Sequence, residues 1–334
     1  MYSILIDSSI IVIFIIFCIS LFLLSKAADY LVDNAVKLSQ IWGLPEIIIG
    51  ATIVSLGTTL PELSASISSA LKGNDSFALG NAVGSIITNT SLILGIGALF
   101  GKIPVGEKSS QKFNLLVTTV FLLIFTTLPY KVQNEGSHIP QWFGFIYLML
   151  VMVYIVYLII QEKNKVSISK KNKSGIQVNK NTRSVFMIIF SIFISALVIA
   201  VSASSLVNSA EILARRIGIS DVIIASTLVA FGTSVPELST CISAAKRNHG
   251  GLVIGNIMGA NILNILLVVG ASAALIPGGI AVTEEFYRIH FITLAIVLSV
   301  FGFFAYNSKI NEISKREGMI LILIYILYLF INFL

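Results

Sequence analysis

The sequence predicts an all-α membrane protein of ten transmembrane helices, arranged as two inverted five-helix repeats with broken helices at the membrane midplane. Three observations predict this fold: the composition, the spacing of the apolar runs, and a polar motif that occurs twice. Of the 334 residues, 56% are hydrophobic and only 11% are charged, whereas a soluble domain carries about 25% charged residues. We therefore expect most of the chain to lie in a cell membrane, which it crosses several times.

Long apolar runs mark the expected helices, because a helix of about 20 apolar residues crosses the hydrocarbon core of a bilayer. The first run has no basic segment before it and no small-residue cleavage site after it, so we expect a span rather than a cleaved signal peptide. The ten expected spans cover residues 8–34, 46–71, 77–100, 113–130, 141–161, 184–210, 219–245, 252–275, 287–307 and 317–334.

The longest break between spans covers residues 162–183 and carries seven Lys and Arg residues among Asn, Ser and Gly. This composition is typical of a solvated linker. The linker divides the chain into a first half, residues 1–161, and a second half, residues 184–334, with five spans in each. Because five is an odd number, two homologous halves in succession enter the membrane in opposite directions, and the repeat is inverted.

The basic residues predict the orientation, since Lys and Arg concentrate in cytoplasmic loops. With the linker in the cytoplasm, seventeen of the 22 Lys and Arg residues lie in inner loops. Both termini are then outside. The net charge of +6 is explained by this topology, and we expect no nucleic-acid partner. The five bases of the outer loops are Lys72, Lys131, Arg215, Arg216 and Arg288.

A segment that combines a helix breaker with an acid occurs twice. Residues 57–64 read GTTLPELS, and residues 232–239 read GTSVPELS. A second segment, GNAVGS from Gly80, recurs as GNIMGA from Gly255 at the same offset of 175 residues. The similarity needs no insertion over two repeats, at about residues 28–99 and 203–274. A duplicated polar site at membrane depth is typical of a transporter built from two related halves.

Glu62 and Glu237 are the two of the sixteen acidic residues that fall near the middle of an apolar span. A charged group buried in lipid costs at least about 3 kcal/mol, so we expect both carboxylates to face a polar cavity or to bind cations. The alternative is a protonated, hydrogen-bonded pair that only holds helices together.

The prolines beside the two acids predict broken helices. Pro61 and Pro236 lack a backbone N–H, and their rings clash with the carbonyl four residues earlier. We expect each helix to open, around Thr58 and around Thr233, and to free carbonyl oxygens. Such backbone is tolerated at this depth only where it lines a cavity.

All the expected ligands are oxygen atoms, from carboxylates, carbonyls and the hydroxyls of Thr59 and Ser234. The absence of His and Cys from the motif argues against zinc and copper. Hard oxygen ligands with two negative charges suit Ca²⁺ and Na⁺, whereas Mg²⁺ gives up its water reluctantly. One turn beyond the second motif, Asn89 and Asn264 are expected to bind ions or to bridge the carboxylates. For Asn81 and Asn256, structural and functional roles stay equally open.

Together, the duplicated motifs resemble the two alpha-repeats of the cation/calcium antiporter superfamily, especially the short prokaryotic Na⁺/Ca²⁺ exchangers. The resemblance covers nearly the whole chain. It implies secondary antiport of Na⁺ for Ca²⁺ by alternating access, in which the first and sixth spans slide across the core. The proton/calcium branch carries an acid where Gly84 and Gly259 stand here, and this difference favours Na⁺ as the coupling ion.

The resemblance also implies a set of ion ligands. A Ca²⁺ site would consist of Glu62, Glu237 and the carbonyls of Thr58 and Thr233. Flanking Na⁺ sites would share the glutamates, and Asn89 and Asn264 would line the middle. The further Na⁺ ligands would be Thr59, Ser85 and Ser55 on one side, and Ser234 and the Ala230 carbonyl on the other.

The chain departs from the family pattern at two positions. Ala260 stands where many exchangers have Ser, which removes a hydroxyl from one Na⁺ site. Asn264 stands where many have Asp, and the loss of that acid points to a protein that does not depend on K⁺.

Other functions fit the sequence less well. The nearest alternative is an H⁺-coupled Ca²⁺ antiporter that works by glutamate protonation. A passive cation channel is disfavoured by the inverted repeat, and a membrane enzyme by the absence of a histidine near the motif. We expect a monomer in the lipid bilayer with Ca²⁺ and Na⁺ as transported ions and no organic cofactor.

Overall fold

The computed structural model describes residues 8–71, 76–128, 137–170, 182–218, 230–307 and 311–333. These residues are almost entirely helical, as predicted, and several helices contain a π-helical turn, labelled η. In the first half the elements are α2 (Ile10–Trp42), α3 (Glu46–Ile49), η1 (Gly50–Val54), α4 (Ser55–Leu71), α5 (Ser76–Thr88), η2 (Asn89–Ile93), α6 (Leu94–Phe100), α7 (Glu107–Thr127) and α8 (Gln141–Lys170). In the second half they are α9 (Thr182–Arg216), α11 (Ala230–Gly232), α12 (Val235–Lys246), α13 (Gly250–Leu263), η4 (Asn264–Val269), α14 (Gly270–Leu275), η5 (Phe286–His290), α15 (Phe291–Asn307) and α16 (Lys315–Phe333).

Eight helical segments of the described ranges are long and apolar enough to cross a membrane. They correspond to eight of the ten expected spans. The tenth expected span corresponds to α16. The seventh, expected at 219–245, is described only from Ala230 onward, where it consists of α11 and α12.

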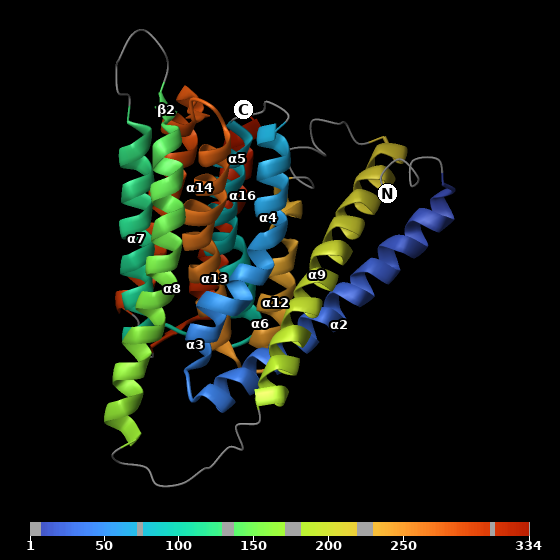
Figure 1. Cartoon of the computed structure of the whole chain (residues 1–334). Helices are drawn as coiled ribbons and strands as arrows, with labels where there is room; N and C mark the ends of the chain where they lie inside the picture. The colour runs from blue at the N-terminus through green and yellow to red at the C-terminus, as the bar shows by residue number, and fades with distance from the viewer. Residues whose placement is uncertain are drawn as a thin grey trace.

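The helices form an upright bundle flanked by one inclined pair (Figure 1). The long helices α2 and α9 lie side by side and lean away from the bundle, while α7 and α8 stand at its other flank. The start of α2 and the end of α16 lie on one side of the bundle. The end of α8 and the start of α9 lie on the opposite side.

Some boundaries differ from the expected ones. Helix α2 continues beyond residue 34 to Trp42 and ends at Gly43, which takes the left-handed conformation that glycine adopts at a helix C-terminus (φ 64°). Helix α8 continues to Lys170 and α9 begins at Thr182, so both enter the segment expected as a linker. A helix satisfies its own backbone hydrogen bonds and can therefore extend beyond the apolar run.

Four two-residue strands pair in loops, a feature that the helical periodicity did not predict. The strand β1 (Ile103–Pro104) pairs antiparallel with β4 (Glu312–Ile313), and Ile103 lies opposite Ile313. The strand β2 (His138–Ile139) pairs antiparallel with β3 (Ile280–Ala281), and His138 lies opposite Ala281. Each pair joins a loop of the first half to a loop of the second.

The structure reproduces the sequence repeat over its central helices. The elements α5, η2 and α6 correspond to α13, η4 and α14 at the offset of 175 residues, and the two π-helical turns begin at Asn89 and Asn264. Figure 1 shows α6 near the end of the bundle where α8 ends, and α14 near the opposite end.

The expected break at the proline is present in the second half and absent in the first. Between α11 and α12, Thr233 and Ser234 form a turn, as predicted. By contrast, α4 runs without interruption through Thr58 and Pro61, so the prediction of an opening around Thr58 is wrong. A proline removes a single backbone hydrogen bond, and the other bonds of α4 keep this helix continuous.

Glycines bring the two halves into close backbone contact where α13 crosses α3 and η1. A Cβ at Gly259 would lie 2.6 Å from Ala51 Cα and 2.6 Å from Ser55 Oγ. A Cβ at Gly255 would lie 2.3 Å from the Ile47 carbonyl oxygen. Small residues at such a crossing let helices approach closely in the absence of a hydrophobic driving force.

We predict that Gly259→Ala destabilises the protein by about 1–3 kcal/mol, because α13 and η1 must separate to admit the methyl group. Its repeat counterpart Gly84 offers a matched control, since a Cβ there meets no atom within 4 Å. Gly84→Ala is expected to leave stability unchanged or slightly raised. Thermal unfolding of the detergent-purified variants checks this, and equal midpoints would contradict the close crossing.

Candidate cation site

The two glutamates of the repeated motif meet in the interior. Glu62 lies in α4 and Glu237 in the first turn of α12, and both side chains are 0% exposed. The Glu62 carboxylate faces Ser85 and Asn264, and the Glu237 carboxylate faces Glu62 and Thr58. None of these neighbouring groups has the geometry of a hydrogen bond to a carboxylate. All four carboxylate oxygens therefore lack a hydrogen-bond partner among the described residues.

Each glutamate-bearing helix packs against the π-helical turn of the other half. Helix α4 contacts η4, which begins at Asn264, and α12 contacts η2, which begins at Asn89. Both asparagines are fully buried, and both amide oxygens lack a partner in the described chain. π-Helical turns occur frequently at functional sites, and here one places Asn264 beside the Glu62 carboxylate, while the other brings the segment that begins at Asn89 into contact with α12.

The threonine at the second position of each glutamate-bearing motif donates a hydrogen bond to the other half. Thr58 Oγ1 donates to Asn256 Oδ1 at 3.3 Å, and Thr233 Oγ1 donates to Asn81 Oδ1 at 3.1 Å. Each asparagine amide then donates to a hydroxyl on the glutamate-bearing helix of its own half, Asn81 to Ser66 at 3.0 Å and Asn256 to Thr240 at 3.1 Å. Asn81 and Asn256 thus have an interhelical bonding role, and Ser66 and Thr240 are site residues that the motif comparison missed.

The hydroxyls of the expected Na⁺ sites are arranged differently from the sequence expectation. Ser234 Oγ lies 3.4 Å from Ser85 Oγ, although the two were expected on opposite sides. The reason is that the glutamate-bearing segment of each half contacts the segment of the other half that begins with Gly-Asn. The hydrogen bond from Thr58 to Asn256 is an example. Thr59, the counterpart of Ser234, is buried with its hydroxyl unpartnered in the described chain, and the counterpart of Ser85 is Ala260.

The two remaining predicted Na⁺ ligands are Ser55 and Ala230. Ser55 is fully buried at the start of α4 and donates to the Thr52 carbonyl at 3.2 Å. Ala230 is the first residue of α11, at the edge of a described range, and its surroundings lie outside the described residues.

The two carboxylates have different electrostatic surroundings. Glu237 lies in the first turn of α12, after the N-cap Ser234. The partial positive charge of a helix N-terminus favours a carboxylate there. Glu62 lies inside the continuous helix α4 and has no such terminus.

The chemistry of the site is that of oxygen ligands. Within the described ranges, no group of three or more His, Cys, Asp and Glu side chains is arranged so that it could hold a metal ion. A cation at the glutamates would therefore complete its shell with hydroxyl, amide or carbonyl oxygens, which suit Ca²⁺ and Na⁺.

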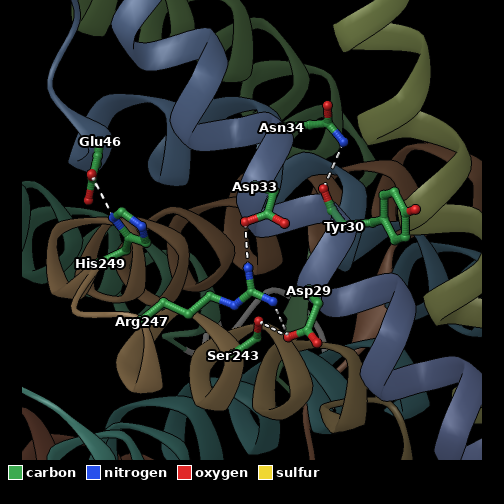
Figure 2. Close-up of polar contacts among 8 residues, drawn as sticks. All are labelled: Asp29, Tyr30, Asp33, Asn34, Glu46, Ser243, Arg247 and His249. Atoms are coloured by element: carbon green, nitrogen blue, oxygen red, sulfur yellow. Dashed lines mark hydrogen bonds and ion pairs between the residues drawn. The ribbon is translucent and has the colours of Figure 1, made fainter.

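A charged cluster joins α2 to the end of α12, outside the buried site (Figure 2). Arg247 contacts Asp33 at 2.5 Å and Asp29 at 3.2 Å, and Ser243 donates to Asp29 at 2.7 Å. A second contact, between His249 and Glu46 at 2.9 Å, joins the same loop to the start of α3. We call Arg247, Asp29, Asp33 and Ser243 the α2–α12 cluster.

Comparisons with known proteins agree on one family. The profile described as sodium/calcium exchanger protein matches residues 12–162 and 187–334. An uncharacterized membrane protein of Methanocaldococcus jannaschii is 31% identical over 93% of this chain and 95% of its own length. The sodium/calcium exchanger MaX1 of Methanosarcina acetivorans is 27% identical over 96% of this chain and 98% of its own.

A solved structure gives the same result. The sodium-calcium exchanger NCX_Mj, soaked with Na⁺ and Sr²⁺, superposes with a TM-score of 0.77 at 27% identity, covering 96% of this chain and 98% of that one. The relatives with a functional name are exchangers rather than enzymes, which confirms the prediction that the chain is not an enzyme. This chain belongs to the sodium/calcium exchanger protein family.

Proposed function

We propose that this protein exchanges Na⁺ for Ca²⁺ across the cell membrane by alternating access, at one site shared by Glu62 and Glu237. The observation that carries the proposal is the set of four fully buried carboxylate oxygens with no hydrogen-bond partner among the described residues. Unpaired charge in a low-dielectric interior is costly, and a bound cation removes that cost. The relatives named above, MaX1 and NCX_Mj, are sodium/calcium exchangers.

Counting charges explains why the two ions compete. Two carboxylates neutralise one Ca²⁺ or two Na⁺, so the two ion sets exclude each other when they share the glutamates. The site without ions carries two like charges that repel each other in the interior. Movement between inward-facing and outward-facing states is therefore easier for the loaded protein, and coupled exchange follows.

The proposal includes ten spans in two inverted repeats, with the linker in the cytoplasm and both termini outside. The correspondence of α5–η2–α6 with α13–η4–α14 supports the repeat. The position of α6 and α14 at opposite ends of the bundle supports its inversion. The start of α2 and the end of α16 lie on one side, which agrees with an even number of crossings.

The coupling ion is tested by flux measurements on the purified protein in liposomes. An outward-directed Na⁺ gradient is expected to drive Ca²⁺ uptake, whereas an outward-directed proton gradient without Na⁺ is not. Uptake with the proton gradient alone would identify the H⁺/Ca²⁺ antiporter instead. Ca²⁺ entry without either gradient would identify a channel.

Glu62→Gln and Glu237→Gln are each expected to reduce Ca²⁺ affinity by more than about a hundred-fold, because each removes one charge from a buried site and leaves the other unbalanced. Calorimetric titration of Ca²⁺ into detergent-purified protein measures this directly. Glu284→Gln is the control, since its side chain is 85% exposed. Wild-type affinity in either glutamine variant would remove the basis of the proposed site.

The inclined helices α2 and α9 are the proposed mobile elements. They pack closely on each other, and the α2–α12 cluster fixes α2 to the bundle. In the repeat, Asp29 and Asp33 correspond to Ser204 and Asn208, so the second half has no equivalent carboxylates. The proposed topology places the cluster on the cytoplasmic side, where it favours the conformer in which the inner path is closed.

We predict that Arg247→Gln changes the exchange rate about three- to five-fold, because partly exposed ion pairs contribute about 0.2–1 kcal/mol each. Asp33→Asn is expected to have a similar effect, and the double variant little more than either single one. Arg288→Gln is the control, since its partner Glu284 lies four residues away in the same segment. Wild-type rates in both single variants would exclude a role of the cluster in the cycle.

A further inference from the structure

A buried asparagine outside the duplicated motifs joins the two halves beside the proposed site. Asn261 lies in α13 and is 0% exposed. Its Oδ1 accepts a hydrogen bond from Asn89 Nδ2 at 3.0 Å, and its Nδ2 donates to Thr90 Oγ1 at 2.8 Å. Both partners lie in η2, so Asn261 holds the first turn of η2 at two points.

These bonds determine which atom of the Asn89 amide remains available. The nitrogen of Asn89 donates to Asn261, while its Oδ1 is buried and without a partner in the described chain. Asn89 follows Ser85 by one helical turn, and η2 contacts α12, which carries Glu237. The atom of the Asn89 amide that is left without a partner is therefore an oxygen, which attracts cations, rather than an NH₂ group, which repels them.

The second half has no such restraint. The repeat counterpart of Asn261 is Ile86, an apolar residue. Accordingly, Asn264 has both amide atoms unpartnered among the described residues. An unrestrained amide beside a carboxylate gains by turning its NH₂ group toward the negative charge, and must turn back before its oxygen contacts a cation.

We propose that Asn261 is a positioning residue for the cation site, which holds the Asn89 amide oxygen toward the ions and thereby favours Ca²⁺ over Na⁺. This inference rests on the proposed Na⁺/Ca²⁺ exchange. The interaction of an amide dipole with an ion scales with ionic charge, so an oriented oxygen contributes about twice as much to binding a divalent as a monovalent cation at the same distance. Ca²⁺ also requires six to eight oxygen ligands.

The test compares Asn261→Leu with the matched control Ile86→Leu, which alters packing at the equivalent buried position of the other half. Asn261→Leu is expected to raise the KM for Ca²⁺ about ten-fold or more. The apparent affinity for Na⁺ is expected to fall by clearly less. Ile86→Leu is expected to leave both constants and the ratio between them unchanged. Na⁺-driven Ca²⁺ uptake into proteoliposomes and calorimetric Ca²⁺ binding in detergent provide the two readouts.

A double variant separates positioning from a general structural effect. If Asn261 acts through Asn89, then Asn261→Leu added to Asn89→Ala causes no further loss of Ca²⁺ affinity. Should Asn261→Leu not fold, Thr90→Val removes the second anchor and is expected to change the Ca²⁺ constant in the same direction. An unchanged Ca²⁺ constant in either folded variant would overturn the inference, as would equal losses for Ca²⁺ and Na⁺. Absence of Ca²⁺ binding and uptake in the wild-type protein would instead overturn the proposed function.

Discussion

Two carboxylates in one low-dielectric interior repel each other and have both lost their hydration. Glu62 and Glu237 are fully buried, and their oxygens lack hydrogen-bond partners among the described residues. Neither half relieves this alone, because each glutamate faces at least one group of the other half: Glu62 faces Asn264, and Glu237 faces Thr58 and Glu62. A cation between the halves is the simplest compensation, and the side chains that face the two carboxylates are the hydroxyls of Ser85 and Thr58 and the amide of Asn264.

Close backbone contact keeps these oxygens in place. Gly255 and Gly259 allow α13 to cross directly over the segment that leads into α4, which brings Asn256 within reach of Thr58. The bond from Thr233 to Asn81 repeats this arrangement with the halves exchanged. Each of these two bonds joins one half to the other, so both form only in the assembled protein. The π-helical turns at Asn89 and Asn264 add one residue to a helical turn and so re-aim the amides without ending the helices.

Much of this arrangement was predictable from sequence because it depends on local or repeated features. Apolar length located the spans, and the rarity of acids in apolar runs identified Glu62 and Glu237. The opening at Thr233 followed from Pro236, but the same argument failed at Thr58, since helix packing decides whether one lost hydrogen bond breaks a helix. The contact of Ser234 with Ser85 depends on how the halves cross, which spacing along the chain does not encode. The duplicated motifs do not predict Asn261, because this residue lies outside them and departs from the repeat. A polar residue opposite an apolar counterpart, here Ile86, is the signal that would have found it.

The departures from the repeat have an energetic meaning of their own. In the proposed inverted repeat, an exchange of roles between the halves converts an inward-facing conformer into an outward-facing one. With two identical halves the two conformers would have equal free energy, so every difference at equivalent positions biases the equilibrium.

The differences between the halves lie at the residues that hold the site and at those that hold the inclined helices. Helix α4 is continuous where α11 and α12 are separated by a turn. Asn261 restrains one asparagine, whereas Ile86 leaves the other unrestrained. The carboxylates of Asp29 and Asp33 face Arg247, whereas their counterparts carry no charge. Exchange needs both conformers to be populated, so these biases must largely offset one another. A variant that removes one of them is therefore expected to alter the balance between conformers as well as the local contact.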